Sequence, residues 1–197
     1  MITEAPPPAS QDRDAVGIAG FAFELGVLKR IGRSGWAHVG IRNAESVAEH
    51  SLRVAQLAAL IAAEEGADPA RAALLAIWHD SQETRTGDIP HTATSYITTP
   101  IDPEQITADQ VAGMPEAAAK TVREAVAEYE SQSTPEAHCA KDADKLECLV
   151  QAIEYRATGH IHVDGWITTS RNAIHTHTAA RIADAALVTS PLAWRDR

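Results

Sequence analysis

Residues 72–83 read Ala-Ala-Leu-Leu-Ala-Ile-Trp-His-Asp-Ser-Gln-Glu, an apolar run that ends in a histidine and an aspartate. The run follows Asp68 and Pro69, an N-cap residue and a proline at the first helical position, which together predict a helix to about Thr84. His79 and Asp80 lie near its end, where a solvated helix face alone does not account for an imidazole beside a carboxylate. We therefore interpret residues 68–84 as a core helix that carries a site.

Start and stop signals of the same kind predict helices along the rest of the chain. Ser46 and Glu49 form a capping-box pattern ahead of an apolar stripe that ends at Gly66. Further helices are expected at residues 15–31, after Asp102, at 115–129, at 134–158 and, as one or two helices capped by Thr168 or Ser170, at 165–187. Residues 33–43 have no sustained periodicity, which predicts an irregular loop. The 38 alanines and the scarcity of strand-forming runs favour an all-α fold.

The size and charge of the chain limit its domain organisation and its binding partners. A chain of 197 residues with 45% hydrophobic content predicts one domain, which we place at residues 15–190 between a disordered tail at 1–14 and a tail at 191–197. The net charge of −10 argues against binding to nucleic-acid polymers or anionic membranes, which need a basic surface. No apolar run of membrane-spanning length and no basic leader is present, so a cytoplasmic location is expected. Cys139 and Cys148 lie nine residues apart on one predicted helix and are expected to be reduced.

The polar residues around the apolar run favour a metal site. Imidazole nitrogens and carboxylate oxygens are ligands of divalent cations, so His79 and Asp80 could bind one together with ligands from two other helices. Glu83 lies one turn from both residues and could transfer a proton beside the cation, although its spacing is equally consistent with a solvated carboxylate. The pairs His160/His162 and His175/His177 have a spacing of two, which does not chelate one ion from a helix.

Five segments in order carry a resemblance to a known family. They are residues 45–51 (ESVAEHS), 78–83 (WHDSQE), 86–90 (TGDIP), 128–136 (EYESQSTPE) and 142–146 (DADKL). Together they resemble the HD-domain metal-dependent phosphohydrolase superfamily and, within it, the branch of 5'-deoxynucleotidase-like proteins. The resemblance runs from about residue 21 to about residue 156.

The resemblance implies a single-domain helical bundle that binds one divalent cation, with Mn, Co, Fe, Zn, Ni or Mg as candidates. The matching ligand positions are His50, His79, Asp80 and Asp144. Asp142 lies about equally far from the apolar stripe of its helix as Asp144, so periodicity does not choose between the two aspartates.

The resemblance also implies roles in catalysis and substrate binding. Glu83 matches an acid/base residue, and Asp88 a carboxylate that supports the site or contacts the sugar. Arg33 could bind phosphate as a bidentate fork, and Trp36 could pack against a sugar or base. Arginine and tryptophan are adjacent in some family members, whereas two residues separate them here.

The expected activity is hydrolysis of (deoxy)nucleoside 5'-monophosphates to nucleoside and phosphate, with the cation activating water and Arg33 offsetting negative charge. One alternative is a phosphohydrolase of nucleoside di- or triphosphates or of a specialised nucleotide. Another is a non-catalytic nucleotide- or metal-binding regulatory module. The expected partner is a small nucleotide. Apolar residues of the last helix could support a homodimer: Ile182, Leu187 and Val188.

Overall fold

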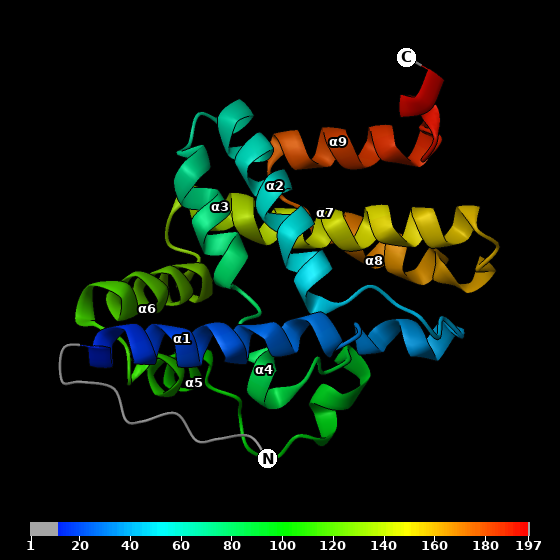
Figure 1. Ribbon diagram of the computed structural model, residues 1–197. Coiled ribbons are helices and arrows are strands. Elements are labelled where there is room, and N and C mark those ends of the chain that lie inside the picture. The colour runs from blue at the N-terminus through cyan, green and yellow to red at the C-terminus, as the bar shows by residue number, and fades with distance from the viewer. Residues whose placement is uncertain (1–11, 197) are drawn as a thin grey trace.

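The computed structural model describes residues 12–196, in which every regular element is a helix and the one β contact is an isolated bridge between Gly32 and Ser46 (Figure 1). The α-helices are α1 (Arg13–Leu25), α2 (Val47–Glu65), α3 (Pro69–Trp78), α4 (Glu83–Thr86), α5 (Pro103–Val111), α6 (Glu116–Ser131), α7 (Pro135–Ala157), α8 (Asp164–Asn172) and α9 (His177–Val188). Short 3-10 helices connect them: η2 (Gly26–Arg30), η3 (Ser34–Val39), η4 (His91–Tyr96), η5 (Ile161–Val163) and η6 (Ala193–Asp196). The all-α prediction is confirmed.

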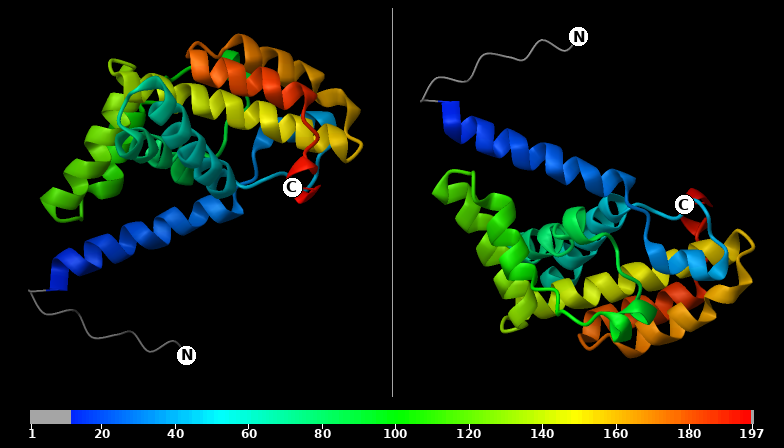
Figure 2. Two further views of the ribbon diagram at one scale, coloured as in Figure 1. Left: turned by 90° about the horizontal axis from the view of Figure 1, so that it is seen from above. Right: turned by 90° about the horizontal axis from the view of Figure 1, so that it is seen from below.

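Helix α7 lies at the centre of the bundle, in contact with α2, α3, α6, α8 and α9. Helices α8 and α9 pack along one side of α7, while α1 runs at an angle along the opposite side of the molecule (Figure 2). The core between α2, α3 and α7 combines large side chains such as Ile61, Leu75 and Leu146 with many buried alanines. Because alanine is small, these three helices approach closely enough to bring polar side chains from each of them to one point.

Four of the predicted helix starts are confirmed by side-chain caps. Ser46 and Glu49 form the full capping box of α2, and Gly66 ends that helix in the left-handed conformation, at φ 77°. The side chains of Asp68, Asp102 and Thr134 each accept a backbone N–H at the start of α3, α5 and α7.

Four sequence expectations need correction. The helix expected to reach Thr84 ends at Trp78, because Ser81 Oγ donates to the carbonyl of Trp78 and the following residues form shorter i to i+3 bonds. The helix at 15–31 is α-helical only to Leu25 and continues as η2 from Gly26. The loop at 33–43 contains η3, which is too short to produce a periodic stripe. Thr168 and Ser170 lie inside α8 and cap nothing.

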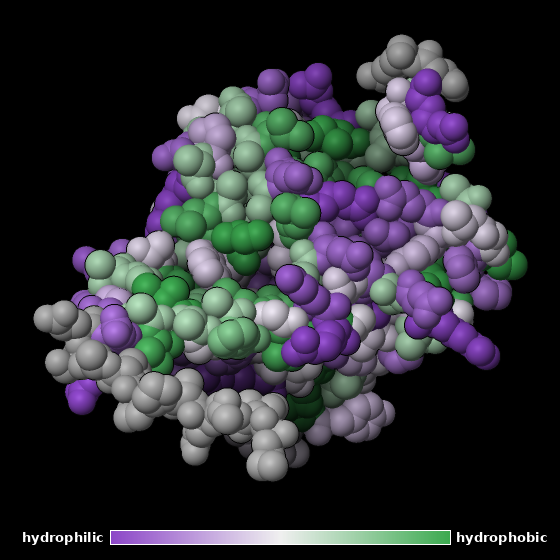
Figure 3. Space-filling model, viewed as in Figure 1, coloured by the Kyte–Doolittle hydropathy of each residue, from purple (hydrophilic) through white to green (hydrophobic). Residues whose placement is uncertain are grey.

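The remaining sequence expectations concern the N-terminal tail, membrane-spanning segments and a homodimer. Most of the tail expected at residues 1–14 lies outside the described residues, and Arg13 and Asp14 already belong to α1. No helix within residues 12–196 is long and apolar enough to cross a membrane. Hydrophobic residues gather on the face formed by α1, α2 and α3 (Figure 3). Phe23 of α1 is 81% exposed. Val188 is 87% exposed on α9, and the homodimer stays a prediction.

Helix α1 crosses the turn between α5 and α6 at a glycine, and this crossing leads to a stability prediction. A Cβ atom at Gly17 would lie 1.7 Å from the carbonyl oxygen of Gly113, so one backbone must move. We expect Gly17→Ala to lower the free energy of unfolding by about 1–3 kcal/mol, as other overpacking substitutions do. Gly20→Ala is the matched control, because its Cβ meets nothing within 4 Å and alanine favours the helix. Urea unfolding of both variants tests the prediction, and equal stabilities would contradict it.

Candidate active site

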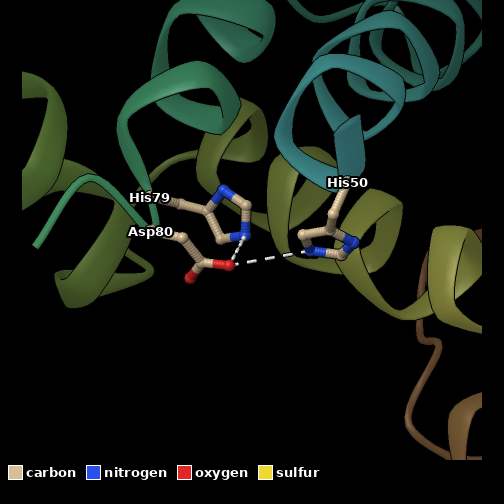
Figure 4. A group of neighbouring side chains, drawn as sticks. All are labelled: His50, His79 and Asp80. Atoms are coloured by element: carbon tan, nitrogen blue, oxygen red, sulfur yellow. Dashed lines mark ion pairs between the residues drawn. The ribbon is translucent and has the colours of Figure 1, made fainter. Parts of the chain in front are cut away.

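Four side chains from three parts of the bundle meet beneath the crossing of α2, α3 and α7. His50 comes from the first turns of α2, His79 and Asp80 from the turn after α3, and Asp144 from the middle of α7. Asp80 Oδ2 lies 3.1 Å from His79 Nε2 and 3.7 Å from His50 Nε2 (Figure 4). Asp144 Oδ1 lies 3.3 Å from His50 Nε2. The structure thus brings ligand atoms of His50, His79 and Asp80 within 4.8 Å of one another and places Asp144 beside His50.

The two imidazoles are held by their other nitrogen atoms. His79 Nδ1 lies 2.7 Å from the carbonyl oxygen of Ala76, which only accepts, so this nitrogen donates and Nε2 is directed toward Asp80. His50 Nδ1 lies 2.6 Å from Glu147 Oε2. Both Nε2 atoms are buried and form no hydrogen bond among the described residues. Two unpaired imidazole nitrogens that face carboxylate oxygens fit a divalent cation.

The charges of the site fit the same interpretation. Burial alone would raise the pKa of Asp80, but His79, Arg33 and His50 outweigh it and hold this pKa below its usual range. Burial also disfavours a charged imidazole at His50, yet Asp144 and Glu147 raise its pKa to about 10. The carboxylates that raise the pKa of His50 would also attract a cation, and cation binding is expected to displace the proton.

The two aspartates of α7 have different neighbours, and only Asp144 lies beside His50. Asp142 faces away from the site. Its Oδ2 accepts the backbone N–H groups of His175, at 3.0 Å, and of Thr176, and these bonds hold the turn before α9.

The role of segment 128–136 could not be derived from its sequence. In the structure, Glu128 of this segment has a structural role. That carboxylate binds Arg71 of α3 and Thr134 at the start of α7.

Glu83 lies at the start of α4, in the wall of a pocket beside the four residues. Its Oε2 atom is buried and has no hydrogen-bond partner among the described residues. Burial, with the nearby Asp80 and Asp88, raises the pKa of Glu83 to about 9. At neutral pH the metal-free protein therefore holds Glu83 in its neutral form, which can donate a proton.

Arg33 and Asp88 form a pair that ties the η3 segment to the site. Arg33 Nη1 lies 2.9 Å from Asp88 Oδ1 and 3.1 Å from Asp80 Oδ2. Asp88 Oδ2 also accepts the backbone N–H of Ser34 at 2.7 Å and the Ser34 hydroxyl. Asp88 therefore holds the arginine in the pocket wall.

Trp36 lies in the wall of the same pocket, but little of its side chain is exposed. Its side chain is in the core, at 2% exposure, between Tyr155 and Trp166, and its Nε1 donates to Glu45 Oε1 at 3.1 Å. Trp166 of α8 stacks on Trp36 with ring centroids 5.5 Å apart and is itself half-buried in the pocket wall. The periodicity of the sequence did not predict that Trp166 lines the pocket, because the position of this side chain depends on how α8 packs against η3.

The pocket consists of two adjoining cavities of about 330 and 550 Å³. The first is lined by Glu83 and Asp88 and the second by Asp144, while Arg33 and Trp166 line both. Lys145 also lines both cavities, and its Nζ lies 2.8 Å from Asp144 Oδ2. Volumes of this size accommodate a small-molecule substrate.

A helical bundle with two histidines and two aspartates beside such a pocket is typical of metal-binding helical proteins. A family model described as "HD domain" matches residues 25–185, and the chain belongs to this family. It is 32% identical over 156 residues to 5'-deoxynucleotidase HDDC2 of Bos taurus, covering 79% of this chain and 76% of that protein. It is 34% identical to 5'-deoxynucleotidase hdd1 of Schizosaccharomyces pombe, covering 72% and 73%. A solved structure of a conserved hypothetical protein from Pyrococcus furiosus is similar with a TM-score of 0.68 and 29% identity, covering 86% of this chain and 98% of that one.

Proposed function

We propose that this protein is a metal-dependent phosphohydrolase that converts (deoxy)nucleoside 5'-monophosphates to nucleoside and phosphate. The observation that carries the proposal is the pair of buried, unpaired Nε2 atoms of His50 and His79 facing Asp80, beside a pocket that Arg33 and Glu83 line. The relatives named 5'-deoxynucleotidase support the substrate class.

Different side chains of the protein have different roles in the proposed reaction. His50, His79, Asp80 and Asp144 would hold the cation, which supplies Lewis acidity to the phosphate and to water. Arg33, held by Asp80 and Asp88, donates N–H groups to the phosphate oxygens as negative charge develops there. Water adds to phosphorus and the bond from phosphorus to the 5' oxygen breaks. Glu83 gives its proton to the departing 5' oxygen and takes up the proton that the attacking water releases as phosphate forms.

Phosphate release from a panel of nucleotides, with each divalent cation added in turn, tests the proposal. Release from deoxynucleoside 5'-monophosphates supports it, and preferred release from di- or triphosphates would favour the first alternative. Tight binding of one nucleotide without release from any would favour a regulatory module and overturn the enzyme. Metal analysis of the purified protein identifies the cation, which the donor set alone leaves open among Mn, Co, Fe, Zn, Ni and Mg.

The half-buried indole of Trp166 is proposed to stack on the nucleoside. Base stacking on an aromatic side chain is worth about 1–3 kcal/mol, so Trp166→Ala is expected to raise KM for a nucleoside monophosphate about 5–150-fold. Deoxyribose 5-phosphate has no base, and its KM should change little. Trp194→Ala is the matched control, because Trp194 is 71% exposed on η6 and does not line this pocket. Equal effects on the two substrates would contradict the stacking role.

A further inference from the structure

Glu147 is a fully buried carboxylate, at 0% exposure, that the proposed reaction does not use. It lies on α7 three residues after Asp144, so both side chains project from the same side of that helix. Its Oε2 lies 2.6 Å from His50 Nδ1. Its Oε1 accepts from Arg53 Nε at 2.9 Å and from Arg53 Nη2 at 2.7 Å. Both oxygens of the buried carboxylate are therefore engaged, one by an imidazole and one by a guanidinium.

We propose that Glu147 is a positioning residue for the cation site and acts through His50. By accepting the Nδ1 proton it leaves the lone pair on Nε2, and it fixes the plane of the imidazole so that Nε2 faces Asp80 and Asp144. An anionic acceptor also makes the ring a stronger electron-pair donor than a neutral one would. The inference rests on the proposed function insofar as it assumes that His50 binds a cation.

Arg53 makes a buried carboxylate tolerable at this position. An unpaired charge inside the bundle would be strongly destabilising, and the two N–H groups that Arg53 donates to Glu147 compensate it. Arg53 lies three residues after His50 on α2, and its Nη1 also binds the carboxylate of Glu154 at 2.9 Å. The imidazole, the carboxylate and the guanidinium thus form one chain of hydrogen bonds between α2 and α7.

A second cation at this position is a competing interpretation, because Glu45, His50 and Glu147 offer three ligand atoms within 4.8 Å of one another. The contacts favour the positioning role. His50 Nδ1 cannot donate its proton to Glu147 and bind a cation at the same time, and Glu45 Oε1 already accepts from Trp36.

Metal affinity measured by calorimetry separates positioning from a purely structural role. Mn²⁺ is titrated into the metal-free full chain of the wild type and of three variants. Glu147→Leu removes the acceptor and is expected to weaken binding about 10–100-fold, as the loss of such partners does in other metal sites. Glu147→Gln keeps an acceptor oxygen without the charge, so its affinity should fall between those of the leucine variant and the wild type. Glu154→Gln is the matched control, because it perturbs the same arginine without touching His50, and it should stay within about twofold of the wild type.

Nuclear magnetic resonance of the zinc-loaded protein provides a second readout. The Nδ1 proton of His50 should resonate far downfield and exchange slowly in the wild type and in Glu154→Gln, and this signal should be lost in Glu147→Leu. If the leucine variant does not fold, Glu147→Gln carries the test with both readouts.

Two results would overturn the inference, and they differ in what else they affect. Equal metal affinity and an unchanged His50 signal in the Glu147 variants would overturn the positioning role alone. A wild-type protein that binds no divalent cation would overturn both this inference and the proposed function. Cation binding that depends on Glu147, without phosphate release from any nucleotide, would support the inference and contradict only the proposed reaction.

Discussion

Asp80→Ala is expected to abolish metal retention and phosphate release together. Asp80 Oδ2 lies within 3.7 Å of both unpaired imidazole nitrogens and also holds Arg33 Nη1 at 3.1 Å. Its removal takes away a ligand charge and one anchor of the arginine. Since a metal ion stabilises charge in the transition state by several kcal/mol, the rate should fall about a thousandfold or more. Metal content of the purified variant and phosphate release at saturating cation measure the two effects.

Asp142→Ala is the control for this experiment. Asp142 is also a buried carboxylate, but it holds the backbone at His175 and Thr176 instead of the site. Its loss should lower the free energy of unfolding and leave the metal content unchanged. A full metal complement in Asp80→Ala would show that Asp80 is not a ligand.

Glu83→Ala is expected to keep the metal and lose most turnover. Glu83 lines the pocket without contributing to the group formed by His50, His79 and Asp80. Loss of a general acid typically costs about 10²–10⁴-fold in rate. Glu24→Gln is a suitable control, because Glu24 binds Arg85 and Thr84 outside the pocket wall. Full activity in Glu83→Ala would exclude the acid/base role.

The pH dependence of kcat gives an independent test of Glu83. Burial and the neighbouring aspartates raise the pKa of this carboxyl to about 9 in the metal-free protein, so the proton is present below that pH and lost above it. The rate should therefore decline on the alkaline side, at a pH of about 9 or below, because a bound cation favours the ionised carboxylate. Glu83→Gln cannot lose this proton, and its residual activity should not show the same decline.

Much of the helical framework could be predicted from local signals. The caps at Ser46, Asp68 and Thr134 act on backbone groups within three residues, so their effect is readable from adjacent sequence. The end of α3 was harder to predict, because no glycine or proline follows Trp78 until Gly87, while the Ser81 hydroxyl competes for the carbonyl of Trp78. The role of Glu147 was only weakly indicated by the sequence. Glu147 lies one turn after Asp144 on the same helix, but no neighbouring residue distinguishes its carboxylate from a solvated one.

The amino-acid sequence by itself determined the all-α architecture, most of the helix starts and a set of candidate ligands, because each depends on composition or on neighbours along the chain. Only the tertiary structure decided which candidates meet. The rotation of α7 against α2 turns Asp144 toward His50 and Asp142 toward the turn before α9. The packing of α8 on η3 buries most of Trp36 and places the half-buried Trp166 beside it in the pocket wall. These outcomes depend on contacts between residues up to 130 positions apart, which the periodicity of a single helix does not encode.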